Sequence, residues 1–254
     1  MTDPILLCVD GLTVSYGGVT AVDAVTFTVP ERQVTGLIGP NGAGKTSLID
    51  ALTGYTRPAA GRVLLDGTDI TRRPPYWRAR QGLTRTFQSV ELFDDLTVRE
   101  NLLAAREHTA ESGLESLLPG RRKAEEHTAD VARALELTGL GAVVDRYPSE
   151  LALGQRKLVG VARALAARPR LVLLDEPAAG LDSDESQELG ARLRSLAQGG
   201  VGVLLVDHDM GLVLSTCDQV MVLDFGRLIA SGPAEKVRKD PVVISAYLGS
   251  EAAA

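Results

Sequence analysis

The most informative stretch of this 254-residue chain is Gly39-Pro40-Asn41-Gly42-Ala43-Gly44-Lys45-Thr46. It fits Gly-x-x-x-x-Gly-Lys-Thr, a loop whose backbone N–H groups cradle phosphates. The apolar run 34–38 before it has the length of a strand, and residues 47–52 after it are able to form a helix. A polyphosphate placed there would meet backbone donors and the positive end of a helix dipole. The alternative is a glycine-rich turn without a ligand, and the strand and helix in register argue against it.

Residues of this loop have separate expected roles. Glycines at 42 and 44 allow the main chain to approach an anion closely. Lys45 is placed to reach the β- and γ-phosphates of a nucleotide, and the Thr46 hydroxyl is a candidate Mg²⁺ ligand. The nucleotide contacts expected from this segment are Gly39, Pro40, Asn41, Gly42, Ala43, Gly44, Lys45, Thr46 and Ser47.

The composition is that of an ordinary soluble globular protein, with 44% hydrophobic and 24% charged residues. A net charge of -6 argues against nucleic acid as the main partner, because duplex-binding proteins usually carry a basic surface. No secretory signal is expected at the start of the chain. Apolar runs such as 203–206 are far shorter than the roughly 20 residues that a spanning helix requires, so a membrane role must come through a partner. Cys8 and Cys217 are isolated and are expected to be reduced core residues.

Alternating or β-branched residues predict an N-terminal antiparallel β-subdomain. Strands are expected at 5–9, 13–16, 24–29, 61–67 and 83–87, the fourth of these including its turn. Gly17-Gly18 predicts a turn, and Asp66-Gly67 is a hairpin signal. A short helix is expected to begin at Pro74, and Gln88 ends the last of these strands.

Helix-forming residues dominate from residue 97 to about residue 140. Thr97-Val98-Arg99-Glu100 fits a capping box at the start of a helix. Residues 113–123 contain a Pro-Gly pair and a short basic run, which predict a solvent-exposed loop, and a helix is expected to resume over 125–137. This block interrupts a chain that otherwise alternates strand and helix. We therefore expect an inserted helical subdomain at approximately 89–165.

A second strand carries two carboxylates. Residues 171–174 are fully apolar, which is typical of a strand buried in a parallel sheet. The strand delivers Asp175 and Glu176 at its carboxyl end, the edge where open α/β sheets bind ligands. Asp175 would hold Mg²⁺ and Glu176 would polarise the attacking water. A pair of acids capping a helix is the alternative, and it would be favoured only without the phosphate loop.

Two further strands are expected at 201–206 and 220–223, on either side of a helix that follows His208-Asp209. The complete pattern predicts an α/β fold: a phosphate-loop NTPase core with a mainly parallel sheet, an N-terminal antiparallel β-subdomain and the inserted α-helical subdomain. We expect residues 1–254 to form a single domain that contains this insertion.

In this order, the motifs resemble those of the ATP-binding subunits of ABC transporters along nearly the whole chain. Tyr16 matches the aromatic residue that stacks on adenine, although an isolated Tyr is more often a half-buried strand residue. Gln88 matches the glutamine at the hinge of the helical subdomain. Leu151-Ala152-Leu153-Gly154-Gln155 matches the family signature, and Ala179-Gly180-Leu181-Asp182 matches the inter-subunit loop. His208 matches the switch histidine, where a structural histidine is the alternative.

The resemblance implies that two such domains close head to tail around two ATP molecules with Mg²⁺. Glu176 would then be the general base, His208 would contact the γ-phosphate, and Gln88 would sense the γ-phosphate and bind Mg²⁺ together with Thr46 and Asp175. The resemblance implies six further nucleotide contacts: Tyr16, Ala152, Leu153, Gly154, Gln155 and Asp182.

The signature departs from its commonest form, Leu-Ser-Gly-Gly-Gln, because Ala152 and Leu153 replace serine and glycine. The usual serine hydroxyl would bond the γ-phosphate of ATP held by the opposite subunit, and alanine cannot. Losing one hydrogen bond to a charged group costs roughly 1.5 to 3 kcal/mol. Gly154 and the N-terminus of the following helix remain. We therefore expect weakened rather than abolished closure.

The hinge motif Arg85-Thr86-Phe87-Gln88 and the tail segment 240–249 are similar to those of branched-chain amino acid importers. Importers of urea and amides share much of this pattern. The resemblance implies permease membrane subunits, a second ATP-binding subunit that is identical or homologous, an indirect solute-binding protein and a place at the cytoplasmic face of the membrane. Tyr76, Trp77 and Leu92-Phe93 are candidates for the permease surface, and packing inside the subdomain explains them equally well.

Two other functions are alternatives to transport. A soluble ABC-type ATPase acting on nucleic acid or ribosomes usually has two ATP domains or a long coiled-coil insertion, and this chain has one domain, no sustained heptads and an acidic balance. A kinase would need an acceptor site and gives no reason for the signature. The sequence favours the transporter subunit.

Overall fold

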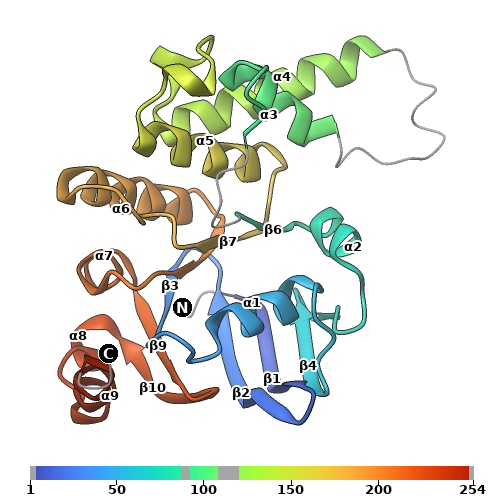
Figure 1. Cartoon of the computed structure of the whole chain (residues 1–254). Coiled ribbons are helices and arrows are strands. Elements are labelled where there is room, and N and C mark those ends of the chain that lie inside the picture. The colour runs from blue at the N-terminus through green and yellow to red at the C-terminus, as the bar shows by residue number, and fades with distance from the viewer. Residues whose placement is uncertain (1–3, 87–91, 108–119, 252–254) are drawn as a thin grey trace.

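The computed structural model describes residues 4–86, 92–107 and 120–251, and the chain forms two sheets with a layer of helices beyond the second sheet (Figure 1). Gln88 therefore lies outside the described residues. The α/β fold with a mainly parallel central sheet, an antiparallel N-terminal sheet and a helical layer is confirmed. None of the described helices combines the length and apolar character that crossing a bilayer demands.

The N-terminal sheet is antiparallel and has the strand order β2-β1-β4-β5. Its strands are β1 Ile5–Tyr16, β2 Val19–Pro30, β4 Ala60–Leu65 and β5 Thr68–Asp69. The turn at Gly17-Gly18 is confirmed, since both glycines have positive φ. The two separate strands expected before it are one strand, because the chain continues through a register shift between Val9 and Leu12 at Gly11, whose φ is 58°.

The second sheet has the strand order β10-β9-β3-β8-β7-β6. Its strands are β3 Val34–Ile38, β6 Leu83–Arg85, β7 Leu171–Asp175, β8 Gly202–Val206, β9 Gln219–Asp224 and β10 Arg227–Pro233. Neighbours from β9 to β6 are parallel, and β10 pairs antiparallel with β9. Every residue of β3, β7 and β8 is buried, as their continuous apolar sequences predict.

Side-chain alternation along the buried strands divides the core into two layers. Leu171 and Leu173 pack with the N-terminal sheet and helix α1 (Lys45–Thr53), whereas Val172 and Leu174 pack in the layer of the later helices. These later helices include α5 Leu153–Ala166, α6 Ser183–Gln198 and α7 Met210–Thr216. The central sheet is therefore covered on both faces, and its carboxyl edge stays open for a site.

The helical layer lies at the top of Figure 1 and contains α3 Val98–Glu107, α4 Gly120–Thr138 and α5, with short 3₁₀ turns at Gly141–Val143 and Pro148–Glu150. The capping box is confirmed, because the Thr97 N–H and hydroxyl both donate to Glu100 Oε2 at 2.8 Å. The expectation of a loop through residue 123 is wrong for 120–123, which form the first turn of α4. Arginine and lysine are good helix formers, and a proline just before a helix is compatible with its first turn.

The remaining elements are short. They are α2 Pro75–Arg80, α8 Ala234–Val237 and α9 Pro241–Glu251. The short helix expected to begin at Pro74 is confirmed, whereas strand β10 was not foreseen. Both cysteines are free thiols, Cys8 half-buried and Cys217 buried, and burial raises the pKa of Cys217 to about 12.

Candidate functional site

The loop between β3 and α1 has a backbone that only glycine fits at two positions. A Cβ on Gly39 would lie 2.1 Å from the carbonyl oxygen of Leu223, and one on Gly44 would lie 2.2 Å from that of Ala21. Gly44 also has a φ of 104°, in the left-handed region that favours glycine. Gly42 has a φ of 80° and open space beside it. The loop is thus held tightly at both ends and is accessible in its middle.

Lys45 begins α1 and reaches back across the loop. Its Nζ donates to the carbonyl oxygens of Gly39 at 2.6 Å and Pro40 at 3.0 Å. Burial lowers the pKa of Lys45, while the nearby carboxylates of Glu176 and Asp175 oppose this shift. The amine therefore lies in the field of the carboxylates that end β7, and the loop and the second motif form one site.

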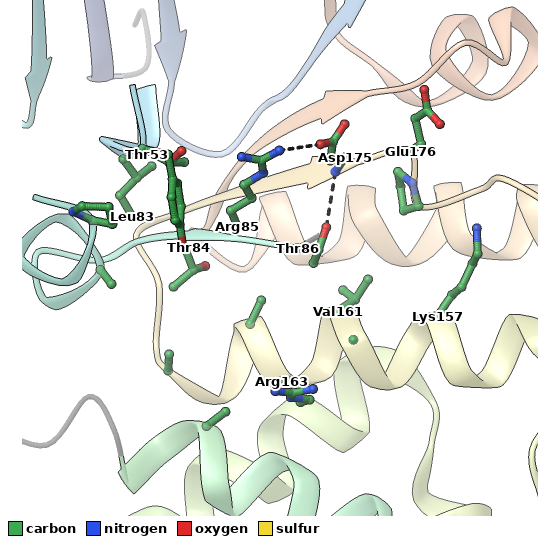
Figure 2. Close-up of a pocket in the computed structure, with 18 of the residues that line it drawn as sticks. Thr53, Leu83, Thr84, Arg85, Thr86, Lys157, Val161, Arg163, Asp175 and Glu176 are labelled. Atoms are coloured by element: carbon green, nitrogen blue, oxygen red, sulfur yellow. Dashed lines mark hydrogen bonds and ion pairs between the residues drawn. The ribbon is translucent and has the colours of Figure 1, made fainter. Parts of the chain in front are cut away.

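Asp175 is the last residue of β7 and is held by two neighbours on the β6 side, as Figure 2 shows. Arg85 Nη2 donates to Asp175 Oδ2 at 2.8 Å, and the Asp175 N–H donates to Thr86 Oγ1 at 3.3 Å. Burial alone would lower the pKa of Arg85, but its hydrogen bonds and ion pairs with Asp175 and Asp50 raise it overall. Asp175 is thus a buried, oriented carboxylate.

Glu176 follows directly and adopts a φ of 47°, a left-handed conformation that is uncommon outside glycine. Its N–H donates to the carbonyl oxygen of Val206 at 2.7 Å, which ties the end of β7 to the end of β8. The helix-capping alternative for this acid pair is wrong, because the next helix, α6, is capped by Asp182. Strained backbone of this kind is typical of functional positions.

His208 lies beside this carboxylate. Its Nδ1 is 3.8 Å from Glu176 Oε1 and 3.6 Å from Asp207 Oδ1, and 59% of its side chain is exposed. His208 is therefore largely exposed, and it is not a core residue. Its contact with the γ-phosphate stays a prediction.

Asp207 is a site residue that the sequence interpretation missed. Its fully buried carboxylate accepts from the N–H groups of Ala178 at 3.2 Å and Asp209 at 3.0 Å. Burial raises the pKa of Asp207, against the effect of these donors. A carboxylate directly after a fully apolar strand is the pattern that identified Asp175, and the same signal was present after β8.

Lys157 was also missed. It projects from α5 towards the loop that follows β7, as Figure 2 shows, and its Nζ donates to the carbonyl oxygen of Ala179. Burial lowers the pKa of Lys157, while Asp207 and Glu176 oppose the shift. This side chain connects the helix of the signature motif with the loop after Glu176. Local sequence patterns carry no signal for such a contact.

The signature residues lie at the start of α5, away from Lys45 and close to the start of α6. Ala152 is the N-cap of α5 and gives no side-chain acceptor, and its N–H donates to Gln155 Oε1 at 3.2 Å. Leu153 is half exposed. Gly154 is buried, and a Cβ there would lie 2.6 Å from Glu185 Oε1. Asp182 caps α6, with Oδ1 accepting from two backbone N–H groups.

Tyr16 is exposed over 47% of its surface at the end of β1, and its hydroxyl lies 3.2 Å from Thr56 Oγ1. Tyr16 therefore also fits the alternative of a half-buried strand residue. Its role against adenine stays a prediction, as do the roles of Gln88, Thr46 and Ser47.

A cavity of about 520 Å³ lies beside Asp175 and Glu176, between the central sheet and the helical layer (Figure 2). Its inner end carries these carboxylates, and its outer part is lined by Tyr55, Pro75 and Leu92. Of the proposed permease residues, Tyr76 and Phe93 are exposed, whereas Trp77 packs partly against the core. The cavity is distinct from the phosphate loop, since Lys45 does not line it.

The residues present fit a magnesium ion that is bound mainly through a nucleotide. Among the described residues, no group of three or more His, Cys, Asp or Glu side chains could hold a metal by itself. Mg²⁺ is typically held by one or two protein oxygens together with phosphate oxygens and water. Asp175 and Thr46 are hard oxygen donors of this kind on neighbouring elements.

Comparison with protein families matches residues 22–179 to the family described as ABC transporter. Residues 227–253 match a family described as branched-chain amino acid ATP-binding cassette transporter. The chain belongs to the ABC transporter family. As ATP-binding subunits of ABC transporters hydrolyse ATP, this ABC protein is an ATPase.

Similar proteins cover this ABC protein almost completely. It is 42% identical to the high-affinity branched-chain amino acid transport ATP-binding protein BraF of Pseudomonas aeruginosa, over 98% of this chain and 99% of that protein. It is 40% identical to LivG of Escherichia coli, which has the same description, with the same coverage. The solved ADP conformation of MJ1267, an ATP-binding cassette of an ABC transporter, matches with 33% identity and a TM-score of 0.84, covering 96% of this chain and 99% of that one.

Proposed function

We propose that this ABC ATPase powers an importer of branched-chain amino acids or related amides, working at the cytoplasmic face of the membrane. The observation that carries this proposal is the full-length similarity, at 40 to 42% identity, to branched-chain amino acid transport ATP-binding proteins. The tail supports it, because residues 227–253 match the corresponding transporter family separately from the ATPase region.

The phosphate loop binds the triphosphate of ATP. Lys45 exchanges its two loop carbonyls for the β- and γ-phosphates, and Gly42 gives open access to the loop backbone. Thr46 and Asp175 would hold Mg²⁺. When bound, this ion neutralises phosphate charge and favours the departure of ADP. Tyr16 stacks on the adenine with its exposed ring.

Hydrolysis depends on the neighbouring carboxylate and imidazole. Glu176 accepts a proton from the attacking water, and its strained backbone, tied to β8, fixes the direction of the carboxylate. His208, whose Nδ1 lies 3.8 Å from Glu176 Oε1, contacts the γ-phosphate beside this carboxylate. The buried Asp207 orients the loop that carries His208 through its two backbone hydrogen bonds.

A second ATP-binding subunit completes each site. The N-terminus of α5 offers backbone donors, because its N-cap Ala152 has no side-chain acceptor. Gly154 and Gln155 contact the γ-phosphate held by the opposite subunit, and Asp182 lies at the same interface. This arrangement is supported by the position of the signature residues, which lie against the start of α6 rather than beside Lys45.

The permease docks at the cavity between the central sheet and the helical layer. Tyr55, Pro75 and Leu92 give its outer part an apolar lining, and Arg163 adds a positive charge. A short amphipathic helix that carries an acidic residue fits this chemistry. Tyr76 and Phe93 extend the same surface, and Gln88 would connect it to the γ-phosphate. A solute-binding protein acts indirectly, on the outer side of the permease.

The test is reconstitution of the chain with the membrane subunits encoded beside it and their solute-binding protein in proteoliposomes. We expect ATP-dependent uptake of radiolabelled leucine, isoleucine or valine, or of an amide or urea if the subfamily is the neighbouring one. Glu176→Gln should abolish uptake while the complex still assembles. Purification with RNA or ribosomal proteins instead of a permease would contradict the proposal.

A further inference from the structure

Arg85 occupies an unusual position between the two nucleotide-binding motifs. It is the last residue of β6, and only 9% of its side chain is exposed. Its Nη1 donates to Asp50 Oδ1 at 2.5 Å, and its Nη2 donates to Asp175 Oδ2 at 2.8 Å. A single buried guanidinium therefore joins a carboxylate of α1 to the carboxylate that ends β7.

This bridge connects the two elements that carry the expected Mg²⁺ ligands. Asp50 lies one helical turn after Thr46 on α1, and Asp175 is the terminal residue of β7. A guanidinium presents its donors in a fixed planar fork, so both carboxylates are held at a set separation. Lysine, with a single flexible ammonium, cannot reproduce this geometry.

The bridge also distinguishes the two oxygens of Asp175. Arg85 engages Oδ2, and a cation approaching that oxygen would be repelled by the guanidinium. A metal ion would therefore bind Asp175 through Oδ1. Thr86 supports the same orientation from the backbone, because its Oγ1 accepts from the Asp175 N–H and its own N–H donates to the carbonyl of Leu173.

We propose that Arg85 is a positioning residue for the Mg²⁺ of the nucleotide site, because it orients Asp175 and fixes the distance between α1 and β7. This inference rests on the proposed role of Asp175 as a metal ligand. Groups that orient metal ligands typically change metal affinity by about 10- to 100-fold when they are removed. A bridge that merely stabilised the fold would change stability and leave metal affinity untouched.

The test compares Arg85→Gln and Arg85→Lys with the wild type. Arg170→Gln is the matched control, because Arg170 also bridges two carboxylates, those of Asp66 and Glu31, on an exposed surface away from the site. Mn²⁺ serves as the probe, and its binding to the protein–ADP complex is followed by electron paramagnetic resonance. Thermal unfolding is measured for each variant, and ADP affinity is measured in EDTA.

For Arg85→Gln we expect Mn²⁺ affinity in the ADP complex to fall by about tenfold or more, whereas metal-free ADP affinity changes less than about twofold. Arg85→Lys should lose less Mn²⁺ affinity than Arg85→Gln. Arg170→Gln should bind Mn²⁺ like the wild type. The Mg²⁺ concentration for half-maximal ATPase activity should rise in parallel. Unchanged Mn²⁺ affinity in folded Arg85→Gln, or an equal loss with and without metal, would overturn the proposal.

Asp50→Asn provides a second variant if Arg85→Gln does not fold. It weakens the α1 end of the bridge and keeps the contact with Asp175. We expect an intermediate loss of Mn²⁺ affinity, and unchanged affinity would reject the bridge as a positioning device. Absence of any metal-dependent ADP binding by the wild type would instead refute the proposed nucleotide site itself.

Discussion

The N-termini of α1 and α5 both carry proposed phosphate contacts, and the chain surrounds them differently. At α1, Gly39 and Gly44 are enclosed by carbonyl oxygens, and Lys45 lies near the carboxylates of β7. At α5, Ala152 caps the helix without a side-chain oxygen and Leu153 is half exposed. In the proposed dimer, one half of the site is therefore assembled within the chain, whereas the other half is presented to the second subunit.

Helices α6 and α7 make this contrast sharper. Asp182 caps the first and Asp209 caps the second, each accepting from two backbone N–H groups. A side-chain cap of this kind uses the donors that an anion would otherwise bind. The α1 and α5 termini have no such cap, which fits their proposed contact with phosphates.

The largest expected effect tests whether ATP hydrolysis depends on Glu176, in the half of the site that contains α1. Glu176→Gln should lower ATPase activity by about 10²- to 10⁴-fold, because the amide cannot accept a proton from water. ATP binding should persist, and an ATP-bound dimer should accumulate in size-exclusion chromatography. Glu188→Gln, which alters an exposed carboxylate paired with Arg192, is the control and should retain activity. Rapid turnover by Glu176→Gln would show that another group is the base.

The next effect concerns the enclosed loop. Gly44→Ala should lose nucleotide affinity and destabilise the fold, because its Cβ would lie 2.2 Å from a carbonyl oxygen in addition to the strain of a φ of 104°. Gly18→Ala is the matched control, with a φ of 92° and nothing within 4 Å. The control should cost only the conformational strain, about 1 to 3 kcal/mol. Equal unfolding free energies by urea titration would contradict the steric argument.

A smaller effect, a gain in dimer affinity, is expected at the N-terminus of α5. Ala152→Ser should add a hydroxyl that bonds the γ-phosphate of the opposite subunit, worth about 1.5 to 3 kcal/mol, so dimer affinity should rise about tenfold or more. The measurement is sedimentation equilibrium with ATP in a Glu176→Gln background. The free monomer should bind ATP with unchanged affinity. If affinity for ATP rises in the monomer as well, the signature acts within its own chain.

The smallest effect is a pH dependence of stability at Asp207. Because burial raises the pKa of this carboxyl above its ordinary 3.8 in the folded state, its contribution to stability is complete below 3.8 and is lost as pH rises through the raised value. Asp207→Asn should lack this slope, so the difference in unfolding free energy between wild type and variant should change with pH. The measurement is urea unfolding of both proteins between pH 4 and 7. Parallel curves of unfolding free energy against pH would contradict the prediction.

Local patterns predicted the parts of the site that lie within one segment. The strand, loop and helix at 34–52 and the strand that ends at Asp175 combine periodicity, glycine spacing and charge in adjacent residues. The single domain with an insertion at 89–165 remains a prediction. The long β1 was predicted as two strands because Gly11 reads as a break, whereas the sheet absorbs it as a bulge.

Contacts between distant segments were beyond such patterns. Arg85 and Lys157 act through partners that are 90 and 22 residues away, so neither spacing nor composition identifies them. Strand β10 was missed for a related reason, since its pairing with β9 depends on the turn at Phe225-Gly226 rather than on an apolar run. Tertiary packing decides such features.

The hydrogen bond from the Glu176 N–H to the Val206 carbonyl has a consequence for protein engineering. It fastens the loop that begins at Glu176 to the loop that carries His208, so we expect a displacement of either segment to be transmitted to the other. Chimeras between related transporters should therefore exchange residues 175–178 and 206–209 together. A graft of either segment alone would pair a carboxylate with an imidazole that its new neighbours no longer align.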